Sequence, residues 1–154
     1  MKKALRTIEK QLVNIYIIAL ESFIPKEEFI NLTIMDYLAI DMSNKYFNDI
    51  SKEGKDEILN YFRDKYNIEV INASLNKLKE VGLTSSSGND VDLIKNNKKG
   101  ILLGITSWKY ESKTEVVLEG YWFFTSVASA GIRTRIVFKD NEWVLKNTDT
   151  IWMS

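Results

Sequence analysis

The stretch Gly120-Tyr-Trp-Phe-Phe-Thr-Ser126 decides the fold, because it holds four consecutive aromatic residues that cannot all be left in water. Successive side chains of an extended strand point to opposite faces, so Trp122 and Phe124 share one face, and Tyr121 and Phe123 share the other. Both faces of this strand therefore need covering. The stretch predicts a central strand of a sheet.

Alternating patterns on both sides of this stretch predict a meander of antiparallel strands. The predicted strands cover residues 101–111, 114–126, 132–139 and 142–153. Asp140 and Asn141 tolerate the left-handed backbone that a two-residue hairpin turn requires. If residues 112–113 form a second such turn, Leu103 lies opposite Trp122, and Trp108 lies opposite Val117.

This register assigns the two faces of the predicted sheet. One face is mainly aliphatic and is expected to receive a helix: Ile101, Leu103, Ile105, Val116, Leu118, Trp122 and Phe124. The other face is half aromatic: Thr106, Trp108, Tyr110, Val117, Glu119, Tyr121 and Phe123. A face that is exposed to water does not need so many apolar residues, and an apolar patch of this kind often marks an interaction site.

The first half of the chain is predicted to be mostly helical. Apolar residues at helical spacing predict an amphipathic helix over residues 4–24, which Pro25 ends. The remaining predicted elements are a short helix at 26–32, a strand at 35–42, a helix at 52–66 capped by Ser51, an extended piece at 67–71, a short helix that ends at Val81 before Gly82, and a mobile loop at 84–92. Helices that precede strands favour one α+β domain spanning residues 1–154.

The composition excludes several classes of function. The chain has no Cys and no His, so a thiolate nucleophile, a Cys/His zinc site and a Ser-His-Asp triad are all excluded. Lys plus Arg and Asp plus Glu are both 21, which argues against a nucleic-acid-binding surface. No metal-binding or cofactor motif is present. We expect neither a catalytic residue nor a cofactor.

The start of the sequence is interpreted as part of the mature protein. Met1-Lys2-Lys3 resembles the opening of a signal peptide, but Glu9 and Lys10 interrupt the region that would have to be apolar. No run of residues is apolar and long enough to cross a membrane. We therefore expect a cytoplasmic location and no membrane contact.

The end of the chain resembles small bacterial members of the nuclear transport factor 2-like superfamily. The resemblance lies in the strand Ile136-Val-Phe-Lys139, the turn into Trp143-Val144, and the last strand ending Ile151-Trp-Met-Ser154. It implies a strongly bent antiparallel sheet of four long strands plus a short strand, wrapped around a long N-terminal helix. Members of the superfamily include ligand-binding, catalytic and toxin-immunity proteins, so the resemblance selects no chemistry.

The favoured function is a non-catalytic protein-interaction or inhibitor module of the immunity type, which forms a homodimer through the outer face of the sheet. Aromatic and Arg side chains dominate protein interfaces, and the expected contact residues are Trp108, Tyr110, Tyr121, Phe123, Arg133 and Arg135. Arg133 and Arg135 share a strand face, where they either bind an anion or partner, or pair with acids such as Glu119 across the sheet.

The alternative function is a small-molecule pocket inside the cone, catalytic or not. Its expected residues are Tyr16, Tyr37, Asp41 and Trp122. In this hypothesis Asp41 is the acid–base group, because it lies on the Tyr37 side of the predicted strand at 35–42. A cavity with converging polar groups is expected if this alternative is correct, and a packed interior if it is not.

Overall fold

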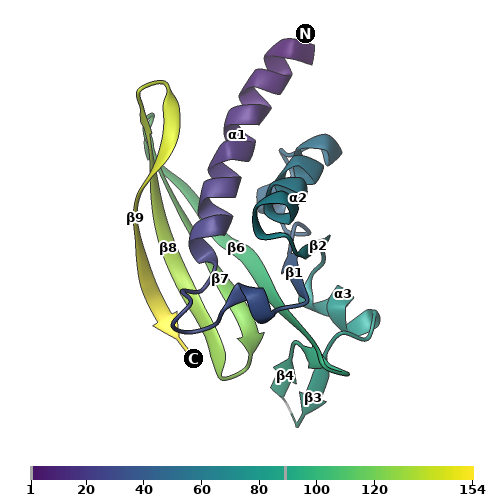
Figure 1. Cartoon of the computed structure of the whole chain (residues 1–154). Coiled ribbons are helices and arrows are strands. Elements are labelled where there is room, and N and C mark those ends of the chain that lie inside the picture. The colour runs from purple at the N-terminus through teal and green to yellow at the C-terminus, as the bar shows by residue number, and fades with distance from the viewer. Residues whose placement is uncertain (1, 89) are drawn as a thin grey trace.

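Seven strands of the described residues form one mixed sheet (Figure 1). The computed structural model describes residues 2–88 and 90–154. The strand order is β2 (Glu69–Asn72), β1 (Tyr37–Ile40), β6 (Lys98–Ser112), β7 (Glu115–Thr125), β8 (Ala128–Lys139) and β9 (Glu142–Met153), and β5 (Ile94–Lys95) also pairs with β6. β1 runs parallel to β2 and to β6, whereas the meander β6–β9 is antiparallel.

The prediction of an antiparallel sheet with four long strands and a short one is therefore wrong for the sheet as a whole, although the long meander is present. Two parallel strands need a crossover connection. Here α2 (Lys52–Tyr66) follows β1 and leads into β2, so the three elements form a β-α-β unit. The sequence pattern gave all three elements but not their parallel pairing.

The helix α1 (Lys2–Phe23) packs against β6, β7, β8 and β9 on one side of the sheet, and α2 packs beside it (Figure 1). This side is called the helix side below. The main core fills it, with Phe23, Leu103, Leu118, Trp122 and Ile136 among its buried members. This confirms the aliphatic face that was predicted to receive a helix.

A second, smaller core lies on the opposite side of the sheet, called the far side below. It joins β1 and β6 to α3 (Leu75–Glu80), and its buried members are Tyr37, Ala39, Ala73, Leu78, Leu93 and Leu102. Tyr121 and Phe123 pack against it and are half-buried. The far side of the quoted stretch is thus partly covered by the chain itself.

The helical capping predictions are confirmed. The Ser51 side chain accepts from the Gly54 N–H at the start of α2, and Asn67 ends α2 with a φ of 50°. Gly82 has a φ of 76°, and the Leu83 N–H donates to the Leu78 carbonyl at 3.0 Å, which closes a Schellman motif after α3. Asp140 and Asn141 have φ values of 53° and 65°, as the hairpin turn requires.

Two predictions for short segments are wrong. Residues 26–32 form no α-helix. The N–H groups of Phe29 and Ile30 donate to the Lys26 carbonyl and close a single turn. Short 3-10 helices follow at Leu32–Ile34 and at Lys45–Phe47. Phe29 consequently lies 53% exposed instead of inward. The predicted loop at 84–92 contains the paired strands β3 (Ser85–Ser87) and β4 (Asp90–Asp92), and Asn89 between them lies outside the described residues.

Glycines on four strand positions allow aromatic rings to lie directly on the backbone. A Cβ atom on Gly104 would lie 2.5 Å from the Tyr121 ring, and one on Gly131 would lie 2.1 Å from the Trp152 indole. Gly100 is covered by Tyr37 in the same way. On the helix side, Phe23 covers Gly120, the first residue of the quoted stretch. Aromatic rings in and around the quoted stretch therefore pack in the space that these glycines leave free.

Candidate functional site

A β-bulge at Thr106 in β6 places the residues predicted to form one interface on different sides of the sheet. Leu103 pairs with Trp122 as predicted, but Ile105 pairs with Gly120 and Ser107 with Glu119, so Thr106 is skipped. Beyond the bulge every side chain changes face. Trp108 therefore pairs with Leu118, and the prediction that it lies opposite Val117 on the second face is wrong.

Trp108 and Tyr110 consequently lie on the helix side. The Trp108 ring contacts Tyr16 at 5.0 Å between centroids and packs against the main core. Tyr110 lies 6.0 Å from Trp108 and is 56% exposed. Of the two, only Tyr110 keeps the exposure that an interface residue needs.

Arg133 and Arg135 lie on the far side, and the alternative in which they pair with acids is confirmed. The Arg133 Nη2 lies 2.7 Å from Glu119 Oε2, directly across the β7–β8 ladder. Arg135 Nη1 lies 3.4 Å from Glu115 Oε2, and Lys146 donates to the same carboxylate at 3.1 Å. The hydrogen bond from Lys146 is the main cause that lowers the pKa of Glu115.

The residues predicted for a pocket do not converge. Tyr16 is buried in the main core, where its hydroxyl donates to the Tyr46 carbonyl. Tyr37 is buried in the far-side core, and its hydroxyl has no hydrogen-bond partner within the described part of the chain. Burial raises the pKa of Tyr37 to about 12. The sheet itself separates these two side chains.

Asp41 lies close to Tyr121. Burial, with a smaller contribution from the Asp41 charge, raises the pKa of Tyr121 to about 12. The Asp41 carboxylate accepts from the Ser43 N–H at 2.9 Å and from the Ser43 hydroxyl at 2.5 Å, so it closes a local turn. This is the geometry of a structural carboxylate rather than of a base facing a cavity.

Trp122 lines a cavity of about 280 Å³ at the end of α1. Its walls come from the end of α1, the segment that follows it, and β7, β8 and β9: Ser22, Ile24, Pro25, Lys26, Glu28, Phe29, Ala130, Ile132, Thr148, Asp149, Thr150 and Met153. Of the four predicted pocket residues, Trp122 is the one that lines it. The cavity is called the Trp122 pocket below.

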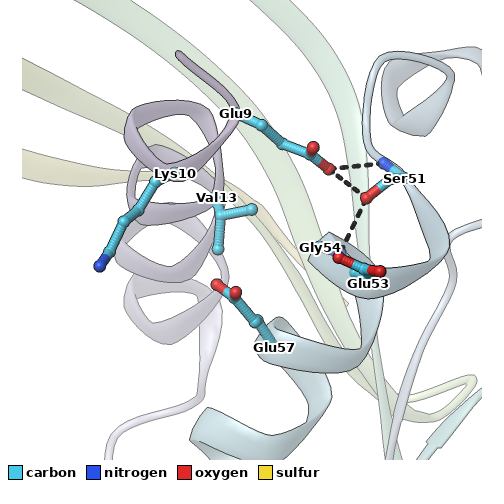
Figure 2. Close-up of a pocket in the computed structure, with 7 residues that line it drawn as sticks. All are labelled: Glu9, Lys10, Val13, Ser51, Glu53, Gly54 and Glu57. Atoms are coloured by element: carbon cyan, nitrogen blue, oxygen red, sulfur yellow. Dashed lines mark hydrogen bonds between the residues drawn. The ribbon is translucent and has the colours of Figure 1, made fainter. Parts of the chain in front are cut away.

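A cleft of about 370 Å³ separates α1 from the start of α2 (Figure 2). Glu9 reaches across it, and its carboxylate accepts from the Ser51 N–H at 2.7 Å and from the Ser51 hydroxyl at 2.5 Å. These hydrogen bonds lower the pKa of Glu9. Sequence reasoning identified Ser51 as the cap of α2, but nothing in the spacing linked it to a residue 42 positions earlier.

Gly54 allows this contact, because a Cβ atom there would lie 2.6 Å from Glu9 Oε1 and 2.9 Å from Ile50. We predict that Glu9→Gln destabilises the wild-type chain by about 1 kcal/mol but has almost no effect in a Gly54→Ala background, where Glu9 is already displaced. Urea unfolding of the four proteins measures this coupling. Equal effects of Glu9→Gln in both backgrounds would contradict it. The better helix propensity of Ala partly offsets the cost of Gly54→Ala itself.

An apolar groove runs between α1 and the β8–β9 hairpin. Two adjoining hollows of about 360 and 460 Å³ share Ile18 and Trp143. The other lining residues are Gln11, Asn14, Ile17, Glu21, Ser22, Tyr61, Phe138, Asn141, Glu142, Val144 and Leu145. This feature is called the α1–β9 groove below.

The strand β9 borders this groove and forms one edge of the sheet (Figure 1). Within the described residues it pairs with β8 alone, so one side of its backbone carries hydrogen-bonding groups without strand partners. It also carries exposed apolar side chains, namely Leu145 at 50%, Ile151 at 38%, Trp152 at 47% and Met153 at 55%. An alternating pattern does not reveal which strand will be an edge, so the sequence predicted β9 but not its exposure.

Comparisons with known proteins identify no relative. Neither a scan against family models, nor a search of curated proteins, nor a search of solved structures found a match. The described helices contain none that is both long and apolar enough to cross a membrane. In the same part of the chain, no group of three or more acidic side chains is arranged to hold a metal ion. The geometry of the chain is therefore the basis for any functional assignment.

Proposed function

We propose that this chain is a non-catalytic protein-binding module that binds a partner along β9 and the α1–β9 groove. The observation that carries this proposal is the set of apolar side chains exposed on one edge strand, Leu145, Ile151, Trp152 and Met153. Soluble chains normally protect a long edge strand, because it is a template for pairing with another chain. Here the edge is twelve residues long.

The chemistry of this surface fits a polypeptide better than a small molecule. An extended segment can add a strand to an open edge, where main-chain hydrogen bonds supply affinity and side-chain pockets supply specificity. The groove next to β9 offers such pockets through Ile18, Trp143 and Leu145. The toxin-immunity proteins of the nuclear transport factor 2-like superfamily, which the end of the chain resembles, act by binding another protein, and an inhibitor of that type with a cytoplasmic location is consistent with this use.

The small-molecule alternative has one observation in its favour. The Trp122 pocket combines apolar side chains with polar groups from Ser22, Thr148 and Thr150. Its volume of about 280 Å³ lies just below the range of ligand sites, which span roughly 300–1,000 Å³. It ranks second because the predicted polar residues Tyr16, Tyr37 and Asp41 do not line it.

Site-specific photo-crosslinking in the native cell tests the proposal. A photoreactive residue replaces Leu145 or Lys146 on β9, and Val81, which is 53% exposed at the end of α3, is the matched control position. We expect both β9 positions to give the same protein adduct and the control position to give none. Adducts of equal yield at all three positions, or none on β9, would contradict the proposal.

A further inference from the structure

We propose that the partner bound along β9 is a second copy of this chain, and that the two β9 strands pair antiparallel about a two-fold axis through Thr148. This inference rests on the proposed function, since it names the occupant of the same edge. It places a homodimer at the sheet edge instead of the outer face, because the second core and the Arg–Glu pairs already occupy the outer face.

The side chains of β9 divide between the two sides of the sheet. Residues opposite the helix-side positions of β8 lie on the helix side: Trp143, Leu145, Thr148, Thr150 and Met153. Residues opposite Val137, Arg135, Arg133 and Gly131 lie on the far side: Val144, Asn147, Asp149 and Trp152. Lys146 and Ile151 are skipped in the ladder and are bulge residues.

This division restricts the register in which two β9 strands can pair. Residues directly opposite each other in an antiparallel pair must share a side of the sheet. A two-fold axis between Asn147 and Thr148 would set Asn147 against Thr148 and Trp143 against Trp152, and both pairs mix the two sides. An axis through Thr148 sets Asn147 against Asp149, Val144 against Trp152, and Trp143 against Met153, and each pair shares a side.

The apolar residues of β9 are self-complementary in this register. Leu145 faces Ile151, Val144 faces Trp152 and Trp143 faces Met153, so all four exposed apolar side chains of β9 obtain an apolar partner. Polar residues remain at the centre. The zero net charge of the chain adds no long-range repulsion between copies.

The two bulges of β9 support the same axis. One lies at Lys146 and the other at Ile151, two and three residues from Thr148 on opposite sides. A bulge shifts the alternation of side chains by one position, and a single bulge would therefore put the two strands out of step. Because each half of β9 contains one bulge, the alternation agrees again beyond both bulges, from the pair of Val144 and Trp152 outward.

The pairing also fills the α1–β9 groove. On the helix side, Met153 of the second copy comes against Trp143, which lines the groove. Phe29 lines the Trp122 pocket together with Met153 and is 53% exposed, so it approaches the groove from the second copy as well. The interface therefore combines a continuous sheet with an apolar contact on its helix side.

Disulfide trapping tests the axis directly, because the wild-type chain contains no cysteine. Thr148→Cys puts two cysteines opposite each other, at Cα distances of about 4.5–5.5 Å that a disulfide spans. Leu145→Cys would put them about 20 Å apart along the strands, and Val127→Cys is a remote exposed control. We expect mild oxidation to give a covalent dimer with Thr148→Cys and not with the two controls. Equal crosslinking of all three, or none with Thr148→Cys, would overturn the axis.

A charge exchange tests the register in solution by sedimentation equilibrium. Leu145→Glu and Ile151→Lys, made singly, are each expected to raise the dimer Kd about a hundredfold, because each disturbs two symmetry-related contacts worth about tenfold apiece. The double variant sets the two introduced side chains, which carry opposite charges, against each other across the axis and is expected to recover most of the loss. Val81→Glu, at an exposed position at the end of α3, should leave the Kd unchanged.

A monomeric wild-type chain at high micromolar concentration would overturn the self-association. So would a dimer that Leu145→Glu leaves intact or a double variant no better than the single ones. Circular dichroism separates these results from unfolding, and Thr148→Cys provides a second measurement at an exposed position. A monomer would not overturn protein binding along β9, since photo-crosslinking to a different protein tests that separately.

Discussion

Gly120→Ala is expected to destabilise the fold by more than about 3 kcal/mol, the upper range for overpacking a core. A Cβ atom at this position would lie 2.2 Å from the Phe23 ring and 2.3 Å from the Gly104 carbonyl oxygen. A ring can turn aside, but the carbonyl belongs to the neighbouring strand and moves only with the sheet. Urea unfolding followed by circular dichroism measures the loss.

Gly104→Ala is the matched control for this substitution. Its Cβ atom would meet the outer atoms of the Tyr121 ring at 2.5 Å, and that ring can move because Tyr121 is only half-buried. We expect a smaller loss there, of about 1–2 kcal/mol. Phe23→Leu should fail to rescue Gly120→Ala, because the carbonyl clash remains. Rescue, or a larger loss at Gly104, would contradict the explanation.

Glu21→Leu is expected to cost about 2 kcal/mol at neutral pH, because it removes the acceptor that joins α1 to α2. The Glu21 carboxylate accepts from the Tyr66 hydroxyl at 2.7 Å and the Tyr61 hydroxyl at 3.0 Å, and it lies 2.5 Å from Lys65 Nζ. Glu80→Gln is a suitable control, since its pair with Lys77 is exposed and contributes little.

The stabilisation by Glu21 should depend on pH in one direction. Burial raises the pKa of this carboxyl, but the hydrogen bonds from Lys65, Tyr66 and Tyr61 together outweigh burial and hold it below the ordinary value of 4.5. A carboxyl with a lowered folded-state pKa stabilises the fold above its unfolded-state pKa, and this contribution is lost as pH falls through the folded-state pKa. The difference between wild type and Glu21→Leu should therefore be constant near neutral pH and shrink below about 4.5. A difference that grows with acidification would contradict this assignment.

Local patterns in the sequence predicted the elements well where the physical cause is local. Ser51, Gly82 and the turn at Asp140 and Asn141 each fix the backbone through contacts within a few residues, and all three were correct. The last strand was predicted with its observed bounds, Glu142–Met153. The pairing of Leu103 with Trp122 was also correct, but the turn at 112–113 from which it was predicted was not. Ser112 pairs with Glu115, so residues 113–114 form the turn, and the two register shifts of the ladder, at Thr106 and after Tyr110, together offset this displacement.

Features that depend on distant contacts were not predicted. The parallel pairing of β1 depends on strands 32 and 63 positions further along the chain, and a strand pattern carries no direction. The bulge at Thr106 moved Trp108 and Tyr110 to the helix side, which a strict alternation cannot anticipate. The exposure of β9 follows from its place at the end of the strand order, which also depends on distant contacts. The candidate interface therefore lies on β9 and not on the predicted outer face of the sheet.

The packing of α1 bears on how the chain is made in the cell. Among the described elements α1 is synthesised first, yet it packs most extensively on β8, β9 and α2, and β9 is the last of these elements to be synthesised. Domains fold as units once their segments are available, so Ile15, Leu20 and Phe23 of α1 stay uncovered until β8 and β9 have been synthesised. Chaperones that bind nascent apolar helices would find their target in residues 12–23, and a chain truncated before β9 would keep that target exposed.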